Sequence, residues 1–213
     1  MDISEFLDEV LCLLVYVLVD ALRFEMAREL SQEHLKDQGD WEVDLRAALA
    51  TPPTVTDVGM TALLPGAERG LVLSQDKRGL TPSLAESAET SLYVREKRVA
   101  YVAKHVDGIF VEAKLQDLAP LSDVRLSQNL QDAELALITS TEDIDGLCES
   151  NPTVARRVLD EVFVQLRRAL KTLFKHGFQS VVVTADHGYL FGEGLVAGEP
   201  TDPPGGKEAL LKR

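Results

Sequence analysis

The chain has 213 residues, of which 45% are hydrophobic and 27% charged, a composition that excludes disordered and collagen-like proteins and suits one good-sized globular domain. Its 22 Lys and Arg against 35 Asp and Glu give a net charge of −13, which argues against nucleic-acid binding by counterion release alone. Two cysteines, Cys12 and Cys148, are too few for a disulfide framework or a four-thiolate zinc site, so we interpret both as reduced thiols.

The first predicted strand is the continuously apolar run Val10–Val19. It is shorter than the roughly 20 residues of a membrane helix, and an acidic start, not a basic signal-peptide region, precedes it. We therefore expect a strand buried on both faces, with a helical lead-in over residues 2–9, no membrane association and a cytoplasmic location. Residues 22–36 have apolar positions at helical spacing, which predicts a helix after this strand.

The middle of the chain shows shorter patterns. Pro65-Gly66 is a stop signal for a short helix, and the segment that ends at His105 has the residue spacing of a longer helix. The expected elements are, in order, a weak strand over Trp41–Leu45, a helix over Val58–Leu64, a strand over Gly70–Leu73, a loop over Arg78–Ser87 and a helix over Glu89–His105.

The last third carries the clearest patterns. Glu134–Thr139 and Ser180–Thr184 have the composition of buried strands, and a long helix begins at Pro152 or Thr153 and runs to His176, where Gly177 ends it. The proline- and glycine-rich tail is expected to be a loop. Alternation of apolar strands with helices predicts an α/β fold, with a mostly parallel sheet and helices on both faces. We expect one domain over residues 1–213.

Polar residues follow the predicted strands at their carboxyl ends. Asp20 follows the first strand, and Asp186 and His187 follow the last. Ligands of open parallel sheets bind at that edge, so we expect these side chains to converge there, where carboxylates and an imidazole suit a divalent cation. Two other interpretations stand beside this one. Asp20 could cap the next helix, and Asp186 could cap a later helix with His187 exposed.

Four further residues could contribute to such a site. Asp145 and Glu149 are four residues apart and would share one face of a helical turn. Taken alone, the pair is better explained as a solvated acidic loop, because Gly146 weakens such a turn. Thr54 and Thr56 precede the predicted short helix. Either threonine could be an ordinary cap, or could place its hydroxyl where a helix N-terminus favours a phosphate.

Four segments in this order resemble successive motifs of one family. They are LVDALRFEMARELS, PPTVTDVGMTALLPG, STEDIDGLCE and VVVTADHGYLFGE. The chain is similar to the alkaline phosphatase superfamily and, within it, to the PglZ domain found in phage-defence systems of the BREX and phage growth limitation types. The resemblance extends from about residue 14 to the tail.

The resemblance implies a role for each matched residue. One metal would be held by Asp20, Asp186 and His187 together with the nucleophile, and a second by Asp145 and Glu149. Thr56 is the implied nucleophile because relatives keep ten residues between the nucleophile and a glycine after the helix, here Gly66; Thr54 is the alternative. The implied cofactors are one or two divalent ions, zinc or manganese, with magnesium a further option.

The sequence departs from the superfamily at two places. Glu149 stands where a histidine is common, which favours a harder metal such as manganese or magnesium over zinc. A further late histidine of the superfamily has no counterpart after His187, so we expect a domain shortened at its C-terminal end or lacking one ligand.

The resemblance implies a metal-dependent phosphoester hydrolase, acting on a diester such as a nucleotide or nucleic-acid linkage, in which Thr56 becomes transiently phosphorylated. Other defence-system proteins are the implied partners. The competing hypothesis is a phosphatase-like scaffold of a defence complex, with incomplete metal coordination and little turnover.

Overall fold

The structure is a computed structural model that describes residues 14–36, 41–76, 79–106, 109–119, 130, 133, 135–139 and 152–188. The predicted lead-in over residues 2–9 and the predicted tail from Gly192 on lie outside these ranges. None of the described helices is both long and apolar enough to cross a membrane.

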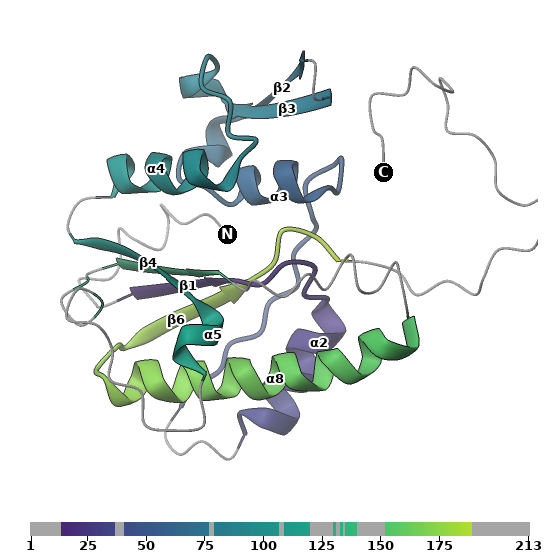
Figure 1. The fold of residues 1–213 in the computed structure, drawn as a ribbon, viewed down its shortest axis with the longest axis vertical. Coiled ribbons are helices and arrows are strands. Elements are labelled where there is room, and N and C mark those ends of the chain that lie inside the picture. The colour runs from purple at the N-terminus through teal and green to yellow at the C-terminus, as the bar shows by residue number, and fades with distance from the viewer. Residues whose placement is uncertain are drawn as a thin grey trace, which may run out of the picture.

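A four-stranded parallel sheet forms the centre of the molecule, in the order β4-β5-β1-β6 (Figure 1). Its strands are β1 (Leu14–Leu18), β4 (Phe110–Lys114), β5 (Leu135–Thr139) and β6 (Ser180–Thr184). Leu18 of β1 pairs with both Thr139 and Thr184, so three strands end level with one another. The segments that leave these strands therefore start from the same edge.

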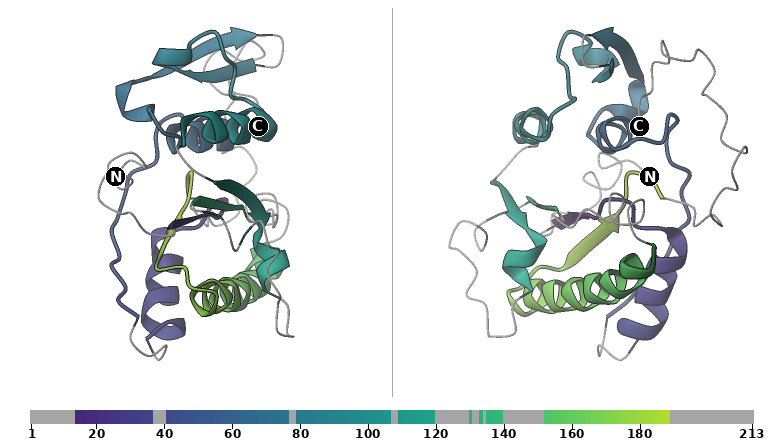
Figure 2. Two further views of the ribbon diagram at one scale, coloured as in Figure 1. Left: turned by 90° about the vertical axis from the view of Figure 1, so that its left-hand side faces the viewer. Right: turned by 45° about the vertical axis from the view of Figure 1, so that its right-hand side comes forward.

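Helices cover both faces of the sheet, which confirms the predicted α/β class (Figures 1 and 2). In the view of Figure 1 the lower face is covered by α2 (Phe24–Glu29), the π-helical turn η1 (Leu30–His34), α5 (Leu115–Leu118) and α8 (Pro152–Lys175). The upper face carries α3 (Thr56–Ala62) and α4 (Arg95–His105). Above them lies an antiparallel hairpin of β2 (Leu71–Asp76) and β3 (Gly79–Leu84).

Strand β1 is apolar at every position because it contributes to both cores. Val15 and Val17 belong to the lower cluster with α8, and Leu14, Tyr16 and Leu18 to the upper cluster with α4. Successive side chains of a strand point to opposite faces, so a strand with helices on both sides buries all of them. The predicted strand over Val10–Val19 is therefore present as β1, within the described part of that run.

Helix α8 begins at the predicted Pro152, ends at Lys175, one residue before the predicted end, and packs through one apolar stripe. Its buried residues recur every three or four positions: Val162, Phe163, Leu166, Ala169, Leu170 and Leu173. The chain leaves the helix through Gly177, whose φ of 95° is the left-handed conformation that glycine adopts at low cost.

Two predictions for the middle of the chain were wrong. Trp41–Leu45 contains no strand; instead Trp41 packs against Phe174 of α8, with ring centroids 4.5 Å apart. Arg78–Ser87 contains strand β3, where a loop was expected. Pro82 weakened the strand pattern, but a two-stranded hairpin consists of edge strands, in which proline is tolerated.

Three other predicted elements are present with different bounds. The short helix begins at Thr56, two residues earlier than predicted, and the longer helix begins only at Arg95. The predicted strand Gly70–Leu73 continues to Asp76.

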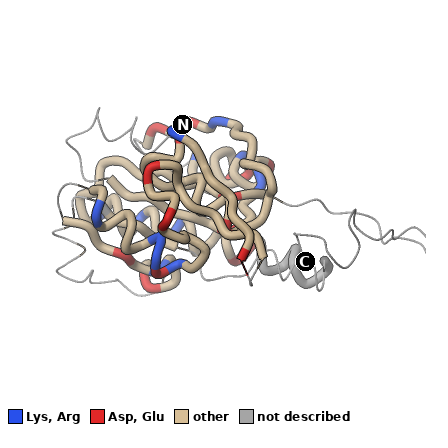
Figure 3. Tube along the Cα trace, turned by 90° about the horizontal axis from the view of Figure 1, so that it is seen from above, with Lys and Arg blue, Asp and Glu red and all other residues tan. Residues whose placement is uncertain are grey.

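Seen from above, Lys and Arg are interspersed with Asp and Glu over the described part of the chain (Figure 3).

Candidate metal centre

Asp20 lies directly beyond the carboxyl end of β1, in a tight turn. The following residue, Ala21, has a φ of 55°, and its backbone N–H donates to Oδ1 of Asp186 over 3.2 Å. Helix α2 begins only at Phe24, with Arg23 at the N-cap position, so the interpretation of Asp20 as that helix's cap is wrong. The turn instead ties the end of β1 to the end of β6.

Asp186 and His187 follow β6 and are buried, with 3% and 6% of their surface exposed. The interpretation of His187 as an exposed residue is therefore wrong. Its Nδ1 lies 3.1 Å from the carbonyl oxygen of Gly188. A carbonyl oxygen can only accept, so Nδ1 donates to it, and Nε2 is the ring nitrogen that remains available to a metal.

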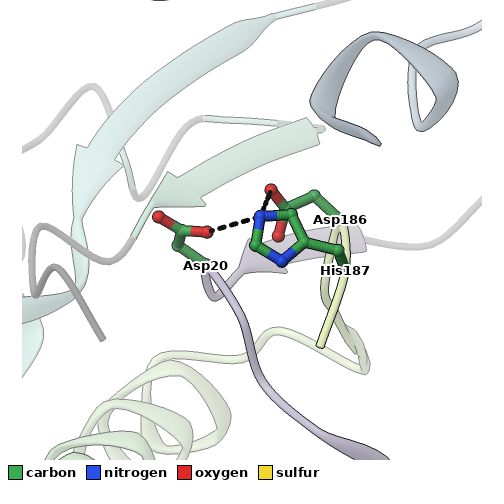
Figure 4. Close-up of side chains that lie close together, drawn as sticks. All are labelled: Asp20, Asp186 and His187. Atoms are coloured by element: carbon green, nitrogen blue, oxygen red, sulfur yellow. Dashed lines mark ion pairs between the residues drawn. The ribbon is translucent and has the colours of Figure 1, made fainter. Parts of the chain in front are cut away.

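The Nε2 atom of His187 is surrounded by oxygens from three separate segments. It lies 3.3 Å from Oδ2 of Asp186, 3.7 Å from Oδ1 of Asp20 and 3.1 Å from Oγ1 of Thr56. Figure 4 shows the two carboxylates beside the imidazole ring. The ligand atoms of Asp20, Asp186 and His187 all lie within 4.8 Å of one another, close enough to contact one cation.

Oδ2 of Asp186 gives a reason to place a cation there. The Asp186 side chain is fully buried, and this oxygen accepts no hydrogen bond from the described part of the protein. A buried carboxylate oxygen without a donor is destabilising, whereas a divalent cation would compensate it directly. Two carboxylates and one imidazole with its other nitrogen bonded to a carbonyl are a donor set that zinc and manganese accept.

Thr56 is the first residue of α3, and its hydroxyl reaches the cluster. Thr54, the alternative nucleophile, is exposed. Helix α3 comes very close to the last loop, because a Cβ built on Gly59 would lie 2.6 Å from the backbone oxygen of Asp186. Sequence analysis missed Gly59, although a glycine inside a seven-residue helix is itself a signal of close approach.

The predicted second-metal residues Asp145 and Glu149 lie outside the described residues. Thr139, the last residue of β5, belongs to the described edge and lines a cavity of about 170 Å³ beside the cluster. Asp20 and Thr56 also line this cavity, together with Arg95 and Arg98 of α4. The two arginines were missed because the charges of α4 have the spacing of an ordinary solvated helix face.

Burial lowers the pKa of Arg98, while the nearby carboxylates of Asp57 and Asp186 act in the opposite direction. Desolvation also raises the pKa of Asp57, against the effect of Arg98. Nη1 of Arg98 lies 3.7 Å from Oδ1 of Asp57. The upper face of the sheet thus carries a partly buried ion pair beside the candidate metal ligands.

Comparison with known proteins identifies the family of the chain. No solved structure matches the chain, but it is 28% identical over 189 residues to the alkaline phosphatase-like protein BrxZ of Escherichia coli O9:H4 (strain HS). That match covers 83% of this chain and 20% of BrxZ, so the chain spans about a fifth of that relative's length. Residues 8–202 match the family described as the BREX system PglZ alkaline phosphatase-like domain. The chain therefore belongs to the PglZ family of alkaline phosphatase-like domains.

Proposed function

We propose that this chain is a metal-dependent phosphoester hydrolase domain, acting on phosphodiesters, in which Thr56 is the nucleophile. Asp20, Asp186 and His187 would hold one divalent cation. Asp145 and Glu149 would contribute a second site. By analogy with BrxZ, the domain would act within a BREX-type phage-defence assembly with other proteins, in the cytoplasm.

The observation that carries this proposal is the position of the Thr56 hydroxyl, 3.1 Å from Nε2 of His187 and at the edge of the carboxylate cluster. A divalent cation bound there would lower the pKa of a nearby hydroxyl and neutralise charge on a phosphoryl group. Thr56 Oγ1 would lose its proton to water and form a bond to phosphorus as the bond to the leaving alcohol breaks. Water would then hydrolyse the phosphothreonine and restore the hydroxyl.

The remaining groups of the site would hold this geometry. The Ala21 N–H fixes Oδ1 of Asp186, which leaves Oδ2 facing the imidazole. The Gly188 carbonyl orients the His187 ring, and the close contact at Gly59 keeps α3 against the loop that carries both residues. Such preorganisation is what a nucleophile needs to approach phosphorus in line.

Hydrolysis of bis(4-nitrophenyl) phosphate with manganese or zinc tests the proposal. Thr56→Ala should lower turnover at least about 10³-fold, because it removes the attacking oxygen. Thr54→Ala is the matched control, two residues away and exposed, and should hydrolyse the diester at the wild-type rate. Equal rates for wild type and Thr56→Ala would contradict the assignment of the nucleophile.

A calorimetric titration with manganese or zinc separates the hydrolase from the competing scaffold. The hydrolase requires at least one ion per chain at micromolar affinity, and Asp186→Asn should weaken that binding. A scaffold that has lost its site would take up less than one ion and would show no turnover. That result would replace the hydrolase with the scaffold.

A further inference from the structure

Strand β2 is the exposed strand of the hairpin that lies above α3 and α4 (Figure 1). Its partner β3 is anchored in the molecule, because Leu84 at the end of β3 is fully buried in the upper cluster. Every residue of β2 after Leu71 is exposed, and two of them are large and apolar: Val72, with 38% of its surface exposed, and Leu73, with 37%. An exposed strand with apolar side chains is a template for pairing with another strand.

Two hydrogen bonds show which backbone groups of β2 point away from β3. In an antiparallel ladder, residue pairs that exchange backbone hydrogen bonds alternate with pairs whose N–H and C=O groups point outward. The Ala85 N–H donates to the carbonyl oxygen of Gly70, so a bonded pair lies directly before β2. Pro82 has no N–H, and its carbonyl oxygen accepts from Leu92, on the other side of β3. Leu73, which faces Pro82, therefore belongs to an outward pair.

By this alternation the outward residues of β2 are Leu71, Leu73 and Gln75. Each presents one N–H and one C=O group at the edge, and the described part of the chain brings no backbone group from another segment to them. The strand also lacks the features that protect exposed edges. It contains neither lysine nor proline, and its register with β3 is unbroken from Leu71 to Asp76.

A second copy of β2, running antiparallel, would complement this edge completely. With a two-fold axis at Leu73, this residue faces Leu73 of the other copy, and Leu71 faces Gln75 of the other copy. All the outward N–H and C=O groups of both strands then find partners, as in the self-complementary interface of a two-fold dimer.

The side chains of β2 are compatible with the same register. The exposed Val72 would face Ser74 of the other copy, and the two Leu73 side chains would cover each other. Asp76 is the only charged residue of β2, and it would lie opposite Gly70 of the other copy. No like charges of the two strands therefore meet, although like charges directly opposite each other would destabilise such a pair.

We propose that β2 is a homodimerisation edge, which pairs with β2 of a second copy to form a four-stranded antiparallel sheet. A two-stranded hairpin is marginally stable by itself, and further strands stabilise it. Two short strands bury less than the about 800 Å² per partner of a stable complex, so the dimer is weak and depends on concentration. The net charge of −13 on each copy opposes association, and added salt should screen this repulsion.

Sedimentation equilibrium of the 213-residue chain between about 5 and about 500 µM tests the inference. The mean mass should rise from one chain toward two, and the rise should be larger at about 500 mM salt than at about 50 mM. Leu73→Pro removes an outward N–H and no hydrogen bond to β3, so the hairpin should remain. Because the dimer loses one hydrogen bond from each copy, its dissociation constant should increase at least about tenfold.

Leu49→Pro is the matched control, at a leucine with 99% of its surface exposed in a segment without regular structure. It should dimerise like wild type. Hydrogen exchange in the wild-type chain covers the case in which Leu73→Pro does not fold. The Leu73 amide should exchange more slowly as concentration rises, whereas the Ser74 amide, bonded to β3, should be protected at every concentration.

Three results would overturn the inference. A mass of one chain at every concentration would leave the edge of β2 to a strand of another protein. Association that weakens with salt would indicate an interface of paired charges. A dimer that a folded Leu73→Pro leaves unchanged, or that leaves exchange of the Leu73 amide unchanged, would place the interface elsewhere.

Discussion

The residues that pack on the two faces of the sheet differ in polarity. Below it, a continuous apolar cluster packs against α8, a helix of 24 residues. Above it, α3 and α4 are shorter, and the buried polar residues of the described chain lie in α3, in β3 and at the carboxyl edge: Thr61, Thr81, Ser83, Asp186 and His187. The lower face is suited to stability, and the upper face holds polar groups in position at some cost in stability.

The largest expected effect on stability comes from the lower face. Leu166→Ala removes a fully buried side chain from α8 and should lower the free energy of unfolding by about 2–5 kcal/mol, through lost burial and a residual cavity. Denaturant unfolding measures the change. Metal affinity at the upper edge should stay at the wild-type value while the protein remains folded.

Lys171→Ala is the control for this substitution, at an exposed position of the same helix. It should change the free energy of unfolding by less than about 0.5 kcal/mol. If Leu166→Ala weakened metal binding in the folded protein as strongly as it lowered stability, the division of roles between the faces would be wrong.

A smaller loss of stability, but a direct effect on the site, is expected on the upper face. Gly59→Ala places a Cβ 2.6 Å from the backbone oxygen of Asp186 and 2.8 Å from its Cβ, so α3 must move away from the loop. Such overpacking costs about 1–3 kcal/mol. Displacement of Thr56 from His187 should also lower diester turnover about 100-fold.

Val58→Ala separates displacement from simple destabilisation. Val58 is fully buried next to Gly59. Its truncation should lower the free energy of unfolding by about 0.5–3 kcal/mol, a loss comparable to that of Gly59→Ala, without pushing α3 outward. Turnover of this variant at a temperature where it is folded should stay near wild type. A Gly59→Ala protein with normal turnover would show that the close approach of α3 does not position the nucleophile.

The same comparison explains what the sequence could predict. Strands β1 and β6 and helix α8 each have an apolar pattern in their own sequence, so the sequence predicted them. Because Asp20, Asp186 and His187 follow two of these strands, their position at one edge of the sheet was predicted as well. The coil at Trp41 packs against Phe174, which is distant in the chain, and the strand containing Pro82 is an edge strand of a hairpin, where proline is tolerated; both predictions were wrong. The glycine inside α3 signals a close approach, but the sequence does not show that Asp186 is the residue it approaches, because that contact is tertiary.

The smallest effect concerns the ion pair of Asp57 and Arg98 on the upper face. Burial raises the pKa of Asp57 above its ordinary 3.8, although Arg98 counteracts this. The folded chain therefore holds the Asp57 proton more strongly than the unfolded chain does. Stability from this group is fully present below pH 3.8 and is lost as the pH rises through the folded-state pKa.

Asp57→Asn removes the ionisation and sharpens the comparison between the faces. The difference in unfolding free energy, variant minus wild type, should grow as the pH rises from about 3.5 into the neutral range. It should stay below about 1 kcal/mol, because 34% of the Asp57 side chain is exposed and water screens its charge. Thermal unfolding across that pH range measures it. A difference that shrank with rising pH would mean that the attraction of Arg98 outweighs desolvation, and that the upper face gains stability from this pair.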